Sequence, residues 1–474
     1  MSLSSDRNFF LPFAIFCLLI TAAFLTIGVQ GQPILVLGFF YALAFWAVAW
    51  KYPAVAMMMV FAIAPIQNDL GSGGLRFSLT EIHVALLLPV AIVRCYMDRR
   101  PIHVGVTLIP VLLYFAVCIY SSLHTFRGND AIVSIAQMII YLLVVVGIFA
   151  SFPTDAEQFR PALYGAIGVC CFIAFWSLAT RNNFILGLGK NGVGQSLSCA
   201  VIIAVELWFA AKNPKVKRWL SIALALLAAG LVFSVSRGAW LGCAMGLILI
   251  CSLRRQFQLM LRVLLVMMPL VAISWQFLPE STQSYATSFD RKRVNIFERY
   301  KFIDAAKGLW AKSPVYGSGV GLRKQYDATN LMWATLAESG VLGLLAFALV
   351  HVAFFAMILR THKLMARDNI HYSVLLIGGA LVLRHLTHGM VDHYWSRGAV
   401  TLAWGSAGMA SYSYFAVRRE MRLRRSQVAS QLSNRLPNFN QRTAHGRPLG
   451  ARLAANRAGL SRLPSPWWGR ADSL

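Results

Sequence analysis

The feature that most constrains this chain is a series of long apolar stretches, each close to the length that crosses a bilayer. A transmembrane helix needs about 20 apolar residues, and roughly 14 stretches approach that length. They lie at residues 9–29, 33–50, 53–67, 79–96, 104–123, 131–150, 162–180, 193–211, 219–235, 238–253, 263–278, 330–358, 372–391 and 397–416. Only 13% of the residues are charged, against about a quarter in soluble domains. The sequence therefore excludes a soluble enzyme or a disordered chain and predicts an all-α, polytopic membrane helix bundle with about 12–14 transmembrane helices.

The net charge of +26 is distributed unevenly between alternate loops. With the N-terminus in the cytoplasm, the inner loops carry clusters of Lys and Arg and the outer loops carry mostly single cations, as the positive-inside rule requires. The inner clusters are Arg99 and Arg100; Lys212, Lys215, Lys217 and Arg218; Arg254, Arg255 and Arg262; and Arg360, Lys363 and Arg367. This alternation predicts a multi-pass protein with both termini cytoplasmic. We interpret residues 9–29 as a retained first helix, because no small-residue cleavage site follows before the next stretch.

Charge and spacing divide the chain into four parts. Residues 1–278 and 330–416 hold the predicted transmembrane helices, 279–329 form a large external loop, and 417–474 form a basic cytoplasmic tail. The loop has nine basic and five acidic residues. Within it, residues 294–310 have helical spacing that places Ile296, Tyr300, Ile303 and Leu309 on one face. We expect a short amphipathic helix on the outer membrane surface.

The last segment, residues 418–474, has twelve arginines, no lysine and two acids. A helix is predicted for residues 417–432 and disorder for the rest. Such a tail is attracted to anionic membrane lipids, and we expect no nucleic acid as a partner. The eight cysteines all lie in apolar stretches and form no CxxC pair, so the sequence supports neither a metal site nor a disulfide framework. We also expect no cofactor.

Ionisable residues at the membrane edge are candidates for function, because they are costly there. Arg237, in the turn Ser-Val-Ser-Arg-Gly, can present its planar fork of donors to phosphate oxygens. It can also act as a topology anchor that reaches the headgroups. The run containing Gly317 and Gly319 can turn tightly and expose backbone N–H groups to a ligand. Glycines also simply build loops, so that signal is weak alone.

A third candidate lies near the end of the stretch at 372–391. Arg384, His388 and Asp392 follow one another at intervals of four, so a continuous helix would carry them on one face. One reading is a buried ion pair with hydrogen-bonded histidines that fixes helix packing. The other is a proton-handling site, because histidine titrates near neutral pH.

Together these segments resemble the O-antigen ligase/polymerase superfamily of bacterial envelope glycosyltransferases, over roughly residues 220–345. That pattern has a Ser-Arg-Gly turn, an external loop with Arg, an aromatic, an Ala and Pro-x-x-Gly-x-Gly, and then Asn followed by Leu-Ala-Glu-x-Gly. The matching residues here are Ser236, Arg237, Gly238, Arg299, Phe302, Ala305, Pro314, Gly317, Gly319, Asn330, Leu336, Ala337, Glu338 and Gly340. Glu81, at the entry to the fourth stretch, resembles the family's early acidic position.

The resemblance implies a metal-independent, inverting enzyme of the bacterial inner (plasma) membrane that acts on undecaprenyl-diphosphate-linked glycans at the external face. It also implies a flippase and a chain-length regulator as candidate partners. The residues assigned to diphosphate binding are Arg237, Arg299, Gly317, Gly319 and Asn330, and those assigned to catalysis are His388, Asp392 and Glu338.

One residue departs from the ligase pattern. The ligases have a His directly before the Asn, as the base for the acceptor, and this chain has Thr329. A threonine hydroxyl is not a base at neutral pH. We therefore favour polymerisation of an exopolysaccharide or O-antigen repeat over ligation to lipid A–core, with His388 as the first candidate base. A proton-coupled secondary transporter and a non-catalytic membrane scaffold remain as alternatives.

Overall fold

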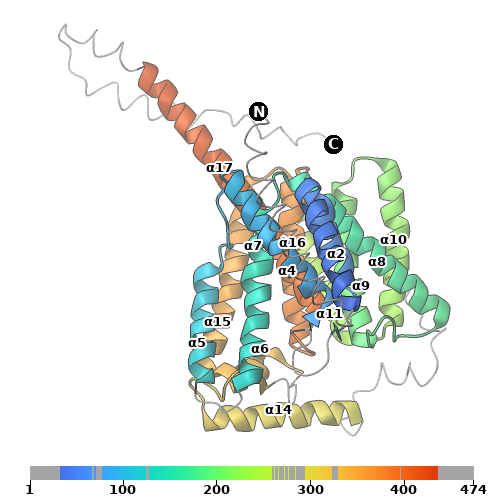
Figure 1. Cartoon of the computed structure of the whole chain (residues 1–474). Helices are drawn as coiled ribbons and strands as arrows, with labels where there is room; N and C mark the ends of the chain where they lie inside the picture. Colours follow the sequence, from blue (N-terminus) through green and yellow to red (C-terminus); the bar gives the residue numbers. More distant parts are fainter. Residues whose placement is uncertain are drawn as a thin grey trace.

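The computed structural model is an all-α, polytopic helix bundle (Figure 1). The fold class predicted from the apolar stretches is confirmed. The structure describes residues 33–66, 69–70, 77–123, 128–258, 294–322, 329–395 and 397–435, and single positions between 261 and 283. The predicted stretch 9–29, most of 263–278 and the tail beyond residue 435 lie outside the described residues.

Eight described helical segments are long and apolar enough to cross a membrane. They are α4 (Leu79–Met97), α6 with η1 and α7 (Gly128–Ser151), η2 with α8 (Ala156–Thr180), α9 (Lys190–Ala210), α10 (Pro214–Phe233), α11 (Arg237–Arg254), α15 with η4 (Leu331–Leu364) and α16 (Ile370–Gly389). The other elements are α2 (Pro33–Lys51), α3 (Pro53–Ile63), β1 (Asp69–Leu70), β2 (Phe77–Ser78), α5 (Leu108–Ser122), α14 (Val294–Lys312) and α17 (Arg397–Arg435). Every predicted stretch within the described ranges is helical.

The interior of the bundle is organised around α16, which packs against α9, α11 and α17. A row of glycines on α11, each four residues apart, lets α11 approach α16 closely. A Cβ at Gly242 would lie 2.8 Å from the carbonyl oxygen of Arg384, and one at Gly246 would lie 3.1 Å from that of Ala380. Small residues at such spacing are the usual means of close helix packing in membranes. This close contact therefore fixes the position of α16 relative to α11.

The two ends of the bundle differ in chemistry. The N-termini of α9, α11 and α15 and the C-terminus of α16 share one end, which α14 crosses (Figure 1). We call it the α14 end. The opposite end collects the cationic loops that the charge pattern assigns to the cytoplasm, and we call it the basic end. There, Lys212 Nζ lies 3.1 Å from Asp368 Oδ2, and Arg254 donates to the carbonyl of Arg367.

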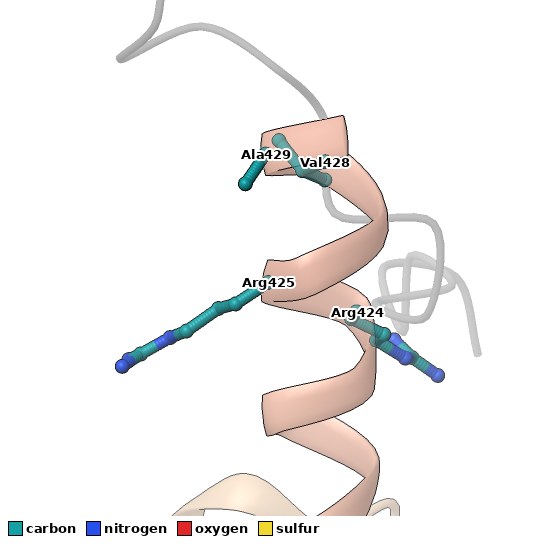
Figure 2. Close-up of a pocket in the computed structure, with 4 residues that line it drawn as sticks. All are labelled: Arg424, Arg425, Val428 and Ala429. Atoms are coloured by element: carbon teal, nitrogen blue, oxygen red, sulfur yellow. The ribbon is translucent and has the colours of Figure 1, made fainter. Parts of the chain in front are cut away.

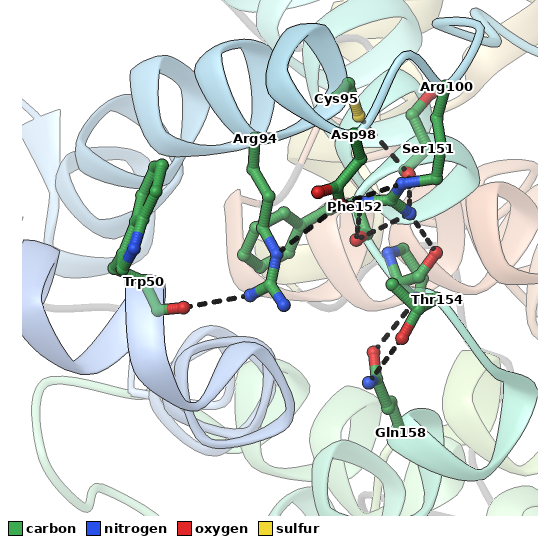
Figure 3. Close-up of polar contacts among 10 residues, drawn as sticks. Trp50, Arg94, Cys95, Asp98, Arg100, Ser151, Phe152, Thr154 and Gln158 are labelled. Atoms are coloured by element: carbon green, nitrogen blue, oxygen red, sulfur yellow. Dashed lines mark hydrogen bonds and ion pairs between the residues drawn. The ribbon is translucent and has the colours of Figure 1, made fainter. Parts of the chain in front are cut away.

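Arginines at the basic end donate hydrogen bonds to backbone carbonyl groups of neighbouring segments (Figure 3). Arg100 Nη1 donates to the carbonyl oxygens of Ser151 and Pro153, at 3.2 and 2.8 Å. Arg100 Nη2 lies 2.9 Å from Asp98 Oδ2, and Arg94 donates to the carbonyl of Trp50. These cations therefore have a structural role in addition to their place in the charge pattern.

α17 continues past the bundle at the basic end (Figure 1). The helix predicted for residues 417–432 is confirmed, because α17 ends at Arg435. On this projecting part, Arg424 and Arg425 point to opposite sides of the helix (Figure 2). Both are exposed, as expected for a cationic helix that has left the apolar core.

Candidate functional site

The loop after α16 is the meeting point of the candidate residues at the α14 end. Arg299 on α14 donates from Nη1 to the carbonyl oxygen of Val391, at 2.6 Å, and its Nη2 lies 3.8 Å from Asp392 Oδ2. Asn330 Nδ2 donates to the carbonyl oxygen of Met390, at 2.7 Å. Asn330 also caps α15, because its Oδ1 accepts from the backbone N–H of Trp333. α14 and the start of α15 are thus both attached to one short loop.

Asp392 is the charged centre of this loop. Its carboxylate is almost fully buried and lies 3.9 Å from Nε2 of His388 and 3.8 Å from Nε2 of His393. The backbone N–H of His393 donates to Asp392 Oδ1, at 2.8 Å. We call Arg299, Asn330, His388, Asp392 and His393 the Asp392 cluster.

The predicted helical face of Arg384, His388 and Asp392 is wrong. α16 ends at Gly389, so Asp392 lies in the loop beyond the helix. The carboxylate therefore turns to Arg299 and the two histidines, and Arg384 instead donates from Nε to Ser198 Oγ on α9. The buried ion pair, one of the two interpretations of these residues, is therefore not formed between Arg384 and Asp392.

Arg237 begins α11 immediately beside the cluster. The turn before it is sharp, with Val235 in the left-handed region at φ +53° and Ser236 at the N-cap. A Cβ at Gly238, the next residue, would lie 3.4 Å from the His388 ring and 2.8 Å from Cγ2 of Val391. The Ser-Arg-Gly turn predicted from the sequence therefore starts a helix against His388.

The glycine run lies in a different place, where it packs into a break in α15. Gly340 has φ +66°, which interrupts the helix. A Cβ at Gly317 would lie 2.5 Å from the backbone of Glu338 and Ser339. The N–H of Val341 donates to the carbonyl of Pro314, at 2.9 Å. We call residues 313–322 together with 337–342 the glycine junction.

The backbone N–H groups that were predicted to meet a ligand are used inside this junction. Gly317 N donates to the carbonyl of Ser313, and Gly319 N donates to the carbonyl of Glu338 and to Ser121 Oγ, each at 3.0 Å or less. Gly317 and Gly319 therefore have a packing role in the structure, and the diphosphate-binding role assigned to them stays a prediction. Only glycine fits where two backbones approach so closely.

Glu338 also belongs to the junction. Its Oε1 accepts from the backbone N–H of Gly321, at 2.9 Å, and its carbonyl accepts from Ser121 Oγ, at 2.6 Å. Its carboxylate thus joins the glycine run to α15, which is a structural role, and the catalytic role assigned to it stays a prediction. Glu81 is structural too, since it completes a capping box with Ser78 and accepts from Tyr141 OH.

The helix predicted for the large loop is present as α14, and one side of it packs against the protein. Ala306 is fully buried with Leu322 and Ala337, and Leu309 packs against them. Tyr300, on the predicted apolar face, is 44% exposed. Arg299, one residue away, lies on the side that contacts Val391.

A buried aromatic layer supports the Asp392 cluster from within the bundle. Tyr394 OH accepts from Trp404 Nε1, at 3.3 Å, and lies 3.2 Å from Nε2 of His351. The His385 ring lies 4.4 Å from the Tyr394 ring. Burial raises the pKa of the Tyr394 phenol, so the hydroxyl stays protonated at neutral pH.

Sequence reasoning missed two features of the site. His393, which is about half exposed beside Asp392, was not selected as a site residue, although it is adjacent in the chain. The separation of Arg384 from Asp392 could not be predicted, because it depends on the residue at which α16 ends. Among the described residues, no group of three or more His, Cys, Asp or Glu side chains is placed to hold a metal ion.

No model of a known protein family matches this chain. No curated protein matches it either. The resemblance stated above therefore stays a hypothesis, and the geometry at the α14 end has to carry the functional argument.

Proposed function

We propose that the protein is a membrane glycosyltransferase of the O-antigen ligase/polymerase type, which joins glycan units carried on undecaprenyl diphosphate. The observation that carries the proposal is the convergence, at one end of a membrane bundle, of the Arg237 turn, Arg299 and the His388–Asp392 pair. We place this end at the external face of the bacterial inner membrane and the basic end in the cytoplasm. This orientation agrees with the positive-inside rule.

The two arginines suit the leaving group of this reaction. Breaking the bond between the anomeric carbon and the diphosphate oxygen develops negative charge on the lipid diphosphate, which guanidinium donors stabilise. Arg299 has five N–H donors and is 40% exposed. Its contacts to Val391 and Asp392 therefore leave donors that can meet phosphate oxygens.

The acceptor needs a base, and His388 is the residue to which we assign that role. The acceptor hydroxyl oxygen bonds to the anomeric carbon while its proton passes to the His388 ring, and the glycosidic bond to the diphosphate breaks. Attack from the opposite side inverts the anomeric carbon. Asp392, 3.9 Å away, orients the ring and stabilises its protonated form.

The burial of His388 suggests how acceptor and donor are coordinated. The side chain is 1% exposed and lies next to Val391, whose carbonyl is held by Arg299. A diphosphate that binds Arg299 competes with this carbonyl and with Asp392. The base would then become accessible only once the donor is bound, which protects the glycan from hydrolysis by water.

Thr329 continues to favour polymerisation over ligation to lipid A–core, because it directly precedes Asn330 and supplies no base. The acceptor in our proposal is a second lipid-linked repeat, and the partners are a flippase and a chain-length regulator. The cationic part of α17 would lie against anionic lipid of the inner leaflet.

The test is glycan transfer by the purified protein in nanodiscs, supplied with undecaprenyl-diphosphate-linked repeats. Arg299→Ala should lower the rate by about 100-fold or more, as expected for losing a charged donor at a developing anion. Lys301→Ala is the matched control, because Lys301 is an exposed cation two residues away on α14. Equal rates for the two variants, at equal protein level, would remove the role of Arg299.

A further inference from the structure

Arg384 is a buried cation whose donor groups are only partly used. Its side chain is fully buried on α16, one turn before His388. Nε donates to Ser198 Oγ on α9, at 2.7 Å, whereas Nη1 and Nη2 have no hydrogen-bond partner among the described residues. A guanidinium does not lose its proton in proteins, so burial cannot be relieved by neutralisation.

Arg254 shows how the same three helices complete a buried arginine elsewhere. Its Nε and Nη2 face the two carboxylate oxygens of Glu206 on α9, with Nε 2.7 Å from Oε2. Nη2 also donates to Ser373 Oγ on α16, and Nη1 donates to the carbonyl of Arg367. At the basic end, α9, α11 and α16 thus supply a carboxylate that they do not supply to Arg384.

The acid closest in sequence to Arg384 is committed to other partners. Asp392 lies near Arg299, His388 and His393. The hydroxyl of Ser198 already donates to the carbonyl of Gln195, at 2.8 Å, and accepts from Arg384 Nε. The Ser198 hydroxyl is therefore used by Nε, and the two Nη groups have no hydrogen-bond partner among the described residues.

The neighbouring histidines add further hydrogen-bond donors beside Arg384. The ring nitrogens of His385 and His388 have no hydrogen-bond partner in the described part of the chain. Each neutral ring carries one N–H. α11 lies close on another side, since a Cβ at Gly242 would be 3.3 Å from Cγ of Arg384. A buried group of donors around a fixed cation, short of acceptors, is the arrangement that binds an anion.

We propose that Arg384 is the receptor of a buried anion site between α9, α11 and α16, which takes a halide or a phosphate oxygen on Nη1 and Nη2. The full burial of the guanidinium limits the ligand to one small anionic atom or group at this point. The proposal does not depend on glycosyl transfer, so either can fail without the other.

The test uses the full chain, purified in detergent with gluconate as the anion. Chloride or bromide then replaces gluconate at constant ionic strength, and the midpoint of thermal unfolding is measured. A ligand that binds the folded state raises this midpoint in a saturable way. We expect that rise in the native protein, its loss in Arg384→Met, and its retention in Lys212→Met, which removes an exposed cation at the basic end.

Two further probes identify the source of the anion. A response to halide and inorganic phosphate indicates a free ion, whereas a response to farnesyl diphosphate alone, again lost in Arg384→Met, indicates a lipid phosphate. No response of the native protein to any of these anions overturns the proposal, as does an unchanged response in Arg384→Met. If that variant does not fold, anomalous scattering from bromide-soaked crystals of the native protein decides, because bromide must then lie against Arg384.

Discussion

The glycine junction and the Asp392 cluster lie at the same end of the bundle but differ in how they use their polar groups. In the junction, the N–H groups of Gly317, Gly319 and Gly321 all donate to backbone or side-chain oxygens. In and beside the cluster, His388 and Arg384 keep buried nitrogens without hydrogen-bond partners among the described residues. A satisfied polar network specifies a structure, and an incomplete one is where a ligand gains most by binding. The first region therefore has a structural role, and the second keeps buried nitrogens for which our proposals supply a partner.

The largest effect on stability should come from filling the junction. Gly317→Ala places a Cβ 2.5 Å from the backbone of Glu338 at a residue with φ +77°, so overlap and strain together should cost about 3 kcal/mol or more. Thermal unfolding in detergent measures the loss. Gly308→Ala on α14 is the control, because a Cβ there meets nothing within 4 Å and should stabilise the helix by up to about 1 kcal/mol. Equal midpoints for the two variants would contradict the packing role.

In the Asp392 cluster, we expect a substitution to change the rate of glycan transfer. Asp392→Asn keeps the size of the side chain but removes the charge beside His388, and it should lower glycan transfer by about 100-fold if His388 is the base. The midpoint of unfolding should move far less than in Gly317→Ala. A variant that transfers glycan at the native rate would show that the carboxylate does not assist His388.

Substitutions at Asn330 should cause an intermediate loss of stability, because Asn330 both caps α15 and contacts the loop of the cluster. Asn330→Ala removes the acceptor for Trp333 N and the donor to the Met390 carbonyl. Loss of the cap should cost about 1 kcal/mol. Asn330→Asp restores the cap acceptor but not the donor, so stability measured for both variants separates the two contacts. Equal losses in both would assign the whole effect to the donor.

The smallest expected effect on stability comes from a contact at the basic end, outside the glycine junction and the Asp392 cluster. Lys212 holds the pKa of the exposed Asp368 carboxyl below its usual value, chiefly through a hydrogen bond. A lowered carboxyl pKa adds stability above the unfolded-state pKa, and this contribution is lost as the pH falls through the folded-state value. Because both side chains are exposed, it should be below about 0.5 kcal/mol and should fall with added salt. The difference in unfolding midpoint between the native protein and Asp368→Asn, at neutral and acidic pH, measures it.

The helices were predictable because a bilayer allows few other structures for long apolar segments. The contacts at the α14 end could not be predicted from the sequence, and the reasons differ between residues. The position of Asp392 depended on the end of α16 at Gly389, and a shift of a few residues changes which groups share a face. The α15 backbone against which Gly317 and Gly319 pack, at Glu338 and Ser339, lies about 20 residues further along the chain. A local glycine pattern cannot distinguish a bound phosphate from a broken helix.

The break at Gly340 has a mechanical consequence for α14. The segment that follows α14 is bonded into this break by backbone groups of Ser318, Gly319, Val341 and Leu342. In the N-terminal part of the described helix, the Arg299 side chain donates to the carbonyl of Val391 and pairs with Asp392. α14 is therefore joined to α15 by backbone hydrogen bonds just beyond its C-terminal end, whereas nearer its N-terminal end Arg299 holds it to the loop after α16 through side-chain contacts.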